Sequence, residues 1–171
     1  KRVAEAVKRL MLKHAVITSV TRDDLSDGGA GIFSETVLCI RRHSSSATIE
    51  LLIPDFKLSL DALKAVTAVS PDIIAHNVET VPSFYPVVRQ GADYKRSLEV
   101  LRIIKKICPQ VKTKSGIMLG IGETKEEVLS VMKDLSSVGC DFLSIGQYLA
   151  PGLRHYPVKE YIRPEQFVDY K

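Results

Sequence analysis

Two patterns of apolar residues alternate along this chain. In one, apolar residues recur three and four positions apart, which is the spacing of a helix with one buried side. In the other, short runs of mostly consecutive apolar residues are typical of strands covered on both faces. The helical pattern covers residues 3–13, 32–43, 59–69, 94–107 and 124–139. The strand pattern covers residues 15–20, 48–54, 73–79, 113–119 and 142–148.

Capping residues mark the ends of several predicted helices. Ser59 precedes one helical segment and can cap it, and Thr124 and Glu127 have the spacing of a capping box at the start of another. Gly139 closes that last helix, as glycine often does. Residues 80–93 show neither pattern, so we expect a long polar loop there.

These elements together predict an α/β fold. Five strands, each preceded by a helix and each nearly all apolar, imply a parallel sheet flanked by helices. Right-handed crossovers should place the strands in sequential order in one curved sheet, with the helices on its outer face. The chain opens in a helix that no strand precedes, so we expect the first strand of the fold to lie outside this sequence.

The composition adds little beyond an ordinary globular protein. The 171 residues suit one domain, with 45% hydrophobic and 26% charged residues. The net charge of +4 comes from 24 basic and 20 acidic residues without any block of like charge, which argues against nucleic acid binding. No apolar run approaches the ~20 residues of a membrane span, so we expect no membrane contact and a cytoplasmic location.

The three cysteines suggest packing rather than chemistry. Cys39, Cys108 and Cys140 lie far apart, in a spacing that fits neither a disulfide framework nor a CxxC-type metal site. Cys39 stands among apolar residues, and the other two lie at the ends of predicted elements. We therefore predict that this chain holds no iron by its own cysteines.

Polar residues gather at the carboxyl ends of the predicted strands. In parallel α/β folds these ends meet on one face, where ligands bind. The polar segments are TRDDLSDGGAG (21–31), Asp55, Asn77 with Glu79, Lys114 with Ser115 leading to GIGET (120–124), and Gln147 with Tyr148. The sequence therefore predicts a ligand site at this edge of the sheet.

Asn77 and Glu79 are the most informative of these residues. Strand residues two apart point the same way, so the amide and the carboxylate should share a face and could bind a ribose diol or an amino-acid head group. The alternative is that Asn77 caps a turn and Glu79 is a surface acid. Polar residues at four other strand ends favour the functional interpretation.

Lys114 and a pair of glycines suggest further contacts. Lys114 should share a face with Gly116 and Met118, where it could meet a carboxylate or form a Schiff base with a carbonyl. Equally, it could be a lysine that extends to solvent from a strand start. Gly28 and Gly29 would let backbone N–H groups approach a ligand closely.

At this point the sequence resembles a known family. The blocks VITSVTRDDLSDGGAGIF, PDFK, AHNVETVPSFYPVVRQGADYKRSLEVL, TKSGIMLGIGETKEEV and IGQYLAPGLRHYPV follow the order found in the lipoyl synthases, which are radical S-adenosylmethionine enzymes. The resemblance spans nearly the whole chain. It implies an open, partial TIM-type barrel of repeated β/α units over residues 1–150, followed by a C-terminal extension over residues 151–171.

The resemblance also implies roles for individual residues. The expected contacts of S-adenosylmethionine are Gly28, Gly29, Asn77, Glu79, Lys114, Ser115, Gln147, Tyr148 and Leu149. Asp24 and Arg89 are expected to contact the substrate. Two departures from the family stand in the last block, where Gly152 and Tyr156 replace a usual Ser and Leu.

The implied activity is the insertion of two sulfurs, at C6 and C8 of an octanoyl group carried by a lipoyl carrier domain. The family uses two [4Fe–4S] clusters, whose cysteine motifs and C-terminal serine are not in this sequence, so the chain alone is expected to be inactive. A eukaryotic member would be mitochondrial or plastid. Two other interpretations stay open, namely a Schiff-base lyase using Lys114 and a non-catalytic binding module.

Overall fold

The computed structural model describes residues 1–44 and 46–171. These residues form one five-stranded sheet in the order β1-β2-β3-β4-β5, with every neighbouring pair parallel. The strands are β1 (His14–Thr18), β2 (Thr48–Leu52), β3 (Ile73–Ala75), β4 (Lys112–Leu119) and β5 (Phe142–Gln147). The predicted parallel α/β fold and sequential strand order are therefore confirmed.

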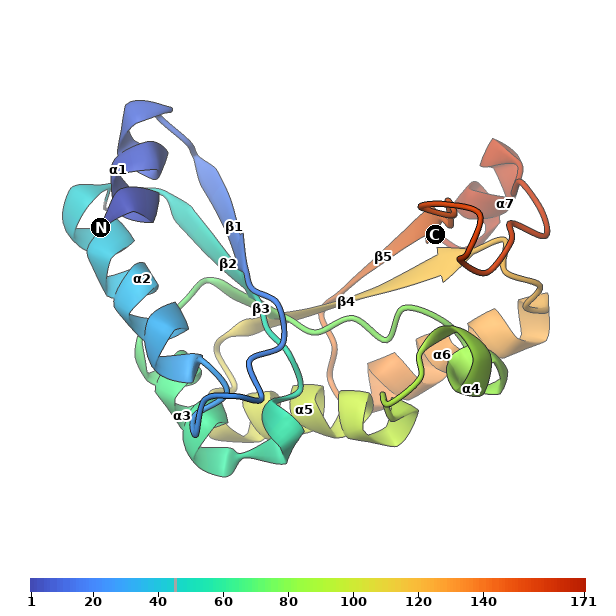
Figure 1. Ribbon diagram of the computed structural model, residues 1–171, viewed down its shortest axis with the longest axis horizontal. Coiled ribbons are helices and arrows are strands. Elements are labelled where there is room, and N and C mark those ends of the chain that lie inside the picture. Colours follow the sequence, from blue (N-terminus) through green and yellow to red (C-terminus); the bar gives the residue numbers. More distant parts are fainter. Residues whose placement is uncertain (45) are drawn as a thin grey trace.

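The helices lie along the outer side of the curved sheet, and the chain termini lie at opposite ends of the open arch (Figure 1). The α-helices are α1 (Arg2–Arg9), α2 (Ala30–His43), α3 (Leu60–Ala68), α4 (Tyr85–Val88), α5 (Tyr94–Ile107), α6 (Lys125–Ser137) and α7 (Pro164–Asp169). Two short 3₁₀ turns are η1 (Phe56–Leu58) and η2 (Pro82–Phe84). Among the described residues, no helix combines the length and apolar composition needed to cross a bilayer.

The apolar core lies between the sheet and these helices. One cluster joins α1, α2, α3 and α5 to the first three strands, and a second joins α5 and α6 to β4 and β5. Burial along β4 alternates accordingly: Thr113, Ser115, Ile117 and Leu119 are buried against the helices, whereas Lys114 and Met118 are only partly buried on the concave side. Each large apolar side chain buried in this way contributes roughly 1.5–3 kcal/mol. Cys39 is a buried member of the first cluster, as predicted.

An aspartate in front of a strand secures the amino-terminal edge of the sheet at two places. Asp72 precedes β3 and accepts the N–H of Ile49 in β2 at 2.7 Å. Asp141 precedes β5 and accepts the N–H of Thr113 in β4 at 2.8 Å. Each carboxylate also pairs with a basic residue of the helix before the strand that donates the N–H: Asp72 with Arg41, and Asp141 with Lys105. The same contact thus recurs in two β/α units.

Several predicted boundaries were wrong. The first helix ends at Arg9 rather than residue 13, because Met11 takes a left-handed conformation with φ of 51°. The third strand ends at Ala75 rather than residue 79, because a bulge interrupts the pairing with β4 after this residue. The loop at residues 80–93 contains η2 and α4, and α7 was not predicted. The Ser59 cap and the Thr124 capping box are confirmed.

Candidate active site at the strand ends

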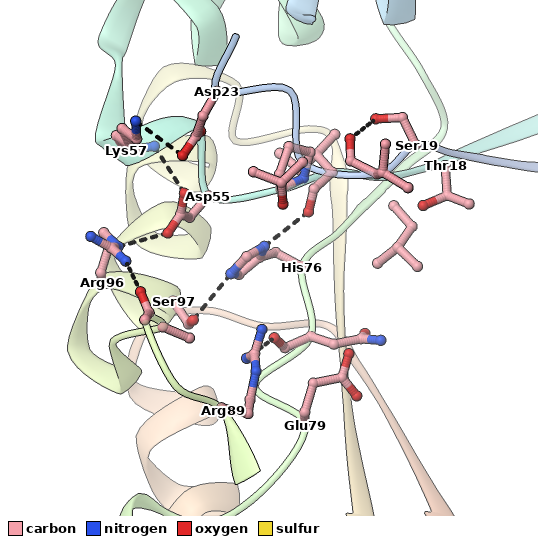
Figure 2. Close-up of a pocket in the computed structure, with 18 of the residues that line it drawn as sticks. Thr18, Ser19, Asp23, Asp55, Lys57, His76, Glu79, Arg89, Arg96 and Ser97 are labelled. Carbon is pink, nitrogen blue, oxygen red and sulfur yellow. Dashed lines mark hydrogen bonds and ion pairs between the residues drawn. The ribbon is translucent and has the colours of Figure 1, made fainter. Parts of the chain in front are cut away.

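A cavity of about 820 Å³ opens at the carboxyl ends of β1, β2 and β3. Its walls come from residues 18–23, the end of β2 and the turn that follows, residues 76–79 and the segment around α4 and the start of α5. Figure 2 shows Glu79 and Arg89 at one end and Asp55, Lys57 and Arg96 at the other. The cavity lies at the edge of the sheet where the sequence predicts a ligand site.

Asn77 and Glu79 both line this cavity, although they do not belong to a regular strand. The N–H of His76 donates to Lys114 O, and the N–H of Glu79 donates to Gly116 O. Three residues of this segment therefore advance against two of β4, which defines a bulge. Glu79 completes it with a φ of 65°, an unusual value for a residue other than glycine. The predicted common direction is correct, but strand alternation is not its cause.

Gly116 makes room for the Asn77 amide. A Cβ atom added at Gly116 would lie 2.9 Å from Asn77 Oδ1, closer than such contacts allow. The bare backbone of β4 therefore forms one side of the Asn77 site. Any other residue at this position would displace the amide from its present place.

Side chains satisfy the backbone of the bulge. Ser115 lies on the helix-facing side of β4, fully buried, and accepts the N–H of Val78 at 3.3 Å. Tyr85 donates its hydroxyl to Val78 O at 2.7 Å. Arg89 donates to both Asn77 O and Val78 O at 3.3 Å. Ser115 therefore faces away from the concave side, and its contact with a ligand stays a prediction that this orientation does not favour.

Lys114 is paired with a buried carboxylate. Its Nζ lies 2.9 Å from Glu50 Oε1, and His14 Nε2 lies 3.2 Å from Glu50 Oε2. Glu50 is only 4% exposed. The Lys114 Nζ is therefore engaged in an ion pair with a buried partner, whereas a Schiff base requires an amine that is free to attack a carbonyl carbon. The geometry therefore disfavours the Schiff-base lyase.

Gln147 faces the other side of the sheet. It is paired in register with Leu119, on the helix-facing side, whereas Lys114 is paired with Phe142. The Gln147 amide donates to Glu160 O at 3.1 Å and accepts the N–H of Ile162 at 2.8 Å. Gln147 and Lys114, both expected to contact S-adenosylmethionine, therefore point to opposite sides of the sheet, because odd and even positions of these strands alternate in direction.

The last two residues of the predicted strand-five motif lie just beyond β5. Tyr148 donates its hydroxyl to Tyr156 O at 2.8 Å, and it lines a second cavity of about 560 Å³ that Glu79 and Arg89 also border. Leu149 is 64% exposed. Their contacts with a ligand stay predictions.

The glycine loop is held by its own aspartate. Asp27 accepts the N–H groups of Gly31 and Gly29 at 2.8 and 2.9 Å, and these backbone bonds lower the pKa of its carboxyl. Gly28 and Gly29 have φ of 63° and 87°. The ring of Phe56 lies against Gly28, where an added Cβ would be only 2.8 Å from Phe56 Cδ1.

The Asp24 carboxylate pairs with a neighbouring residue of the same loop. It accepts two hydrogen bonds from the Arg22 guanidinium, at 2.7 and 2.6 Å, and this guanidinium lowers the pKa of the Asp24 carboxyl. Asp23, its neighbour, lines the cavity instead. A substrate contact by Asp24 stays a prediction.

His76 lines the cavity, although it was not among the expected ligand contacts. Its Nδ1 lies 2.9 Å from Ile53 O, and its Nε2 lies 3.1 Å from Ser97 Oγ. Burial lowers its pKa, so the ring is neutral, with Nδ1–H donating to the carbonyl and Nε2 accepting from the hydroxyl. Its position directly before Asn77 was the one available signal.

Two ion pairs also border the cavity. Arg96 Nε lies 2.6 Å from Asp55 Oδ2, and Lys57 Nζ lies 3.0 Å from Asp23 Oδ2. These pairs connect the turn after β2 to the loop after β1 and to α5. They leave the cavity with a balanced rather than a strongly basic or acidic wall.

Comparison with solved structures identifies the fold. The maturase HydG of the [FeFe]-hydrogenase matches with a TM-score of 0.75 at 15% identity, over 97% of this chain and 39% of that one. Methylornithine synthase (PylB) matches with a TM-score of 0.71 at 15% identity, over 94% of this chain and 45% of that one. Identities this low show the fold alone, an open member of the TIM-type barrels.

Comparison of sequences is more specific. The lipoyl synthase of Geobacter metallireducens is 59% identical over 99% of this chain and 60% of its own length. That of Caldicellulosiruptor saccharolyticus is 54% identical over 100% of this chain and 60% of its own length. The chain therefore spans about 60% of the length of the curated relatives that it matches. The sequence model described as the Radical SAM superfamily matches residues 1–135. The chain belongs to the radical SAM superfamily, and within it the sequence is similar to lipoyl synthases.

Proposed function

We propose that the protein acts as a lipoyl synthase, inserting two sulfurs at C6 and C8 of an octanoyl group attached to a lipoyl carrier domain. The observation that supports this most directly is 59% identity to a lipoyl synthase along nearly the whole chain. Of the blocks that carry the resemblance, AHNVET supplies the bulge that borders the 820 Å³ cavity, and TKSGIMLGIGET supplies Met118 and Ile121, which border the second cavity.

The cavity suits S-adenosylmethionine as the cofactor. Its volume of about 820 Å³ is within the roughly 300–1,000 Å³ typical of small-molecule sites. The Glu79 carboxylate can accept hydrogen bonds from ribose hydroxyls or an ammonium, and the Asn77 amide can both donate and accept. Gly28 and Gly29 border neither this cavity nor the second one, and their contact with the cofactor stays a prediction from the resemblance. When bound, the cofactor would supply the group that removes hydrogen from an unactivated carbon.

The remaining proposed contacts take different parts. Lys114 lies on the concave side of β4, two residues before Gly116, and pairs with Glu50. We assign this ion pair to the polar wall next to Asn77. Tyr148 borders the second cavity beside Glu79, where it could meet the far end of the same ligand. Leu149 follows it with most of its side chain free for contact.

Iron–sulfur clusters are part of the proposal for the whole protein. The described residues contain no group of three His, Cys, Asp or Glu side chains that could hold a metal. Cys39 is buried in α2, and Cys108 and Cys140 lie in separate parts of the chain. The residues described here do not fit a cluster, so no step of the reaction is assigned to cluster ligands in this chain.

The proposal is tested with the full-length protein after reconstitution with iron and sulfide under anaerobic conditions. An octanoyl-lysine peptide from a lipoyl carrier domain serves as substrate, and the same peptide with unmodified lysine is the control. We expect 5′-deoxyadenosine and a peptide carrying two added sulfurs, with neither above background in the control.

Two other results would contradict the proposal. Formation of 5′-deoxyadenosine without any sulfur in the peptide would retain radical chemistry and reject the lipoyl synthase. Borohydride trapping of a carbonyl compound on Lys114 would support the Schiff-base lyase in its place.

A further inference from the structure

The bulge before the candidate site has an unusual set of backbone partners. Outside it, β3 and β4 bond to each other through their backbones in a parallel ladder. Within it, the N–H of Val78 donates to the Ser115 hydroxyl, and Asn77 O accepts from Arg89. Val78 O accepts from Tyr85 and Arg89, and also from the nearby Thr80 N–H at 2.8 Å. Side chains therefore replace the ladder just where the chain carries Asn77 and Glu79.

These partners are needed because the bulge is buried and strained. Val78 is 0% exposed, so its N–H and C=O have no access to water and would be costly to leave unpaired. Glu79 is held in the left-handed region, which a residue other than glycine keeps only when its surroundings require it. The backbone pairing with β4 resumes at this strained residue: Glu79 N–H donates to Gly116 O, and Met118 N–H donates to Glu79 O.

Tyr85 is the strongest of the three partners. Its hydroxyl makes the shortest contact with the bulge, 2.7 Å to Val78 O, and its ring lies 5.4 Å beneath the Arg89 guanidinium, which it therefore helps to place. Burial raises the pKa of Tyr85, so its hydroxyl stays a donor at neutral pH. Tyr85 borders neither the 820 Å³ cavity nor the 560 Å³ cavity.

We infer that Tyr85, Arg89 and Ser115 are positioning residues that lock the bulge, and that this lock aims Asn77 and Glu79 into the cavity. The resemblance predicted Ser115 and Arg89 as ligand contacts, and the inference gives these two residues a different role. It rests on the proposed function for the identity of the ligand. The lock itself rests only on the hydrogen bonds, the burial and the strain described above.

Two matched variants of the full-length, reconstituted protein test the lock. Tyr85→Phe removes only the hydroxyl, which donates to Val78 O and accepts from Arg89; the bonds from Thr80 N–H and Arg89 to Val78 O remain. Tyr94→Phe is the control, because Tyr94 packs edge-to-face on Tyr85 at 5.6 Å and donates a partly buried hydroxyl bond, 2.9 Å, to Asp134. The probe is S-adenosylhomocysteine, measured by calorimetry. We expect about 10-fold weaker binding in Tyr85→Phe, as for the loss of one buried hydrogen bond, and affinity within about twofold of wild type in Tyr94→Phe.

Amide hydrogen exchange provides a second readout that needs no ligand. In Tyr85→Phe, the amides of Glu79 and Met118 should exchange faster than in wild type, and in Tyr94→Phe they should not. Unchanged exchange in Tyr85→Phe, or an equal change in both variants, would overturn the inference. Failure of the wild-type protein to bind S-adenosylhomocysteine would instead count against the proposed function, and the exchange result would still decide the lock.

Discussion

At the scale of single residues, the site depends on a few backbone conformations that side chains rarely adopt. Phe56, Lys57 and Leu58 are consecutive residues with φ between 47° and 60°, a left-handed turn directly after β2. Such conformations cost roughly 1–2 kcal/mol per residue for L-amino acids. The turn places the Phe56 ring against Gly28 and edge-on to Phe33, with 6.2 Å between the two ring centroids. The strained turn therefore positions a ring that supports the glycine loop.

Gly28→Ala tests this support. The new Cβ would combine left-handed strain with a contact at 2.8 Å to the Phe56 ring, so we expect unfolding to become easier by about 2–4 kcal/mol. Urea titration followed by circular dichroism measures the change. Gly29→Ala is the matched control, because its φ is also positive but its nearest neighbour, Arg22 Cβ, is 3.6 Å away. We expect about 1–2 kcal/mol there, and equal losses in the two variants would show that Phe56 gives no support.

At the scale of elements, the sequence predicted existence and order far better than ends. Apolar periodicity was sufficient to find all five strands, because each packs apolar side chains into one of the two clusters beneath the helices. It failed from Ala75 onward, because a bulge inserts one residue without changing the apolar pattern: Val78 is as buried as a regular strand residue would be. The orientation of Ser115 and Gln147 was likewise missed, because a family motif carries no information about which face of a strand each residue occupies.

The two aspartates that secure the amino-terminal edge give a prediction at this scale. Lys105, Lys112 and the Thr113 N–H hold the pKa of the Asp141 carboxyl far below its usual value against the opposing effect of burial. A depressed folded-state pKa means that the stabilisation is present above the unfolded pKa, ~3.9, and is lost as the pH falls below it. Asp141→Asn should therefore cost about 2 kcal/mol at pH 7 and less at pH 3, where part of the loss remains because the folded carboxyl, with its strongly lowered pKa, is still ionised.

Urea titrations at the two pH values measure this difference. Asp72→Asn is the matched comparison, since Asp72 occupies the same place in its unit but its side chain is 43% exposed, against 20% for Asp141. We expect about half the loss for Asp72. A cost for Asp141→Asn that is independent of pH would mean that packing, and not the charge, explains the contact.

At the scale of the whole molecule, the C-terminal segment is attached at the ends of two neighbouring strands, β4 and β5. Gly120 O accepts the N–H groups of Lys159 and Glu160, and Gln147 holds Glu160 and Ile162. This attachment brings residues 156–163 back over β4 and β5, beside the second cavity. The last strand ends at Gln147, three residues before the predicted boundary at residue 150, and the division into two parts stays a prediction.

Gln147→Ala tests that attachment. We expect the barrel to remain folded while amide exchange rises at Ile162, because the amide side chain that accepts its N–H is removed. Tyr148→Phe, which loses the bond to Tyr156 O instead, should leave Ile162 unchanged. Exchange at Ile162 that does not respond to Gln147→Ala would show that apolar contacts with α6 hold the segment.

The sequential strand order also bears on how the chain folds during synthesis. Each strand pairs only with the strand before and after it, so every pairing closes a loop of one β/α unit. The free-energy cost of closing a loop grows slowly, by about 0.6 kcal/mol for each doubling of its length. Because each pairing closes one unit, this cost is divided into small and similar steps. A growing chain can therefore add each unit to the edge of the sheet as it leaves the ribosome, so that the bulge and its three side-chain partners, all within residues 76–115, assemble when β4 docks.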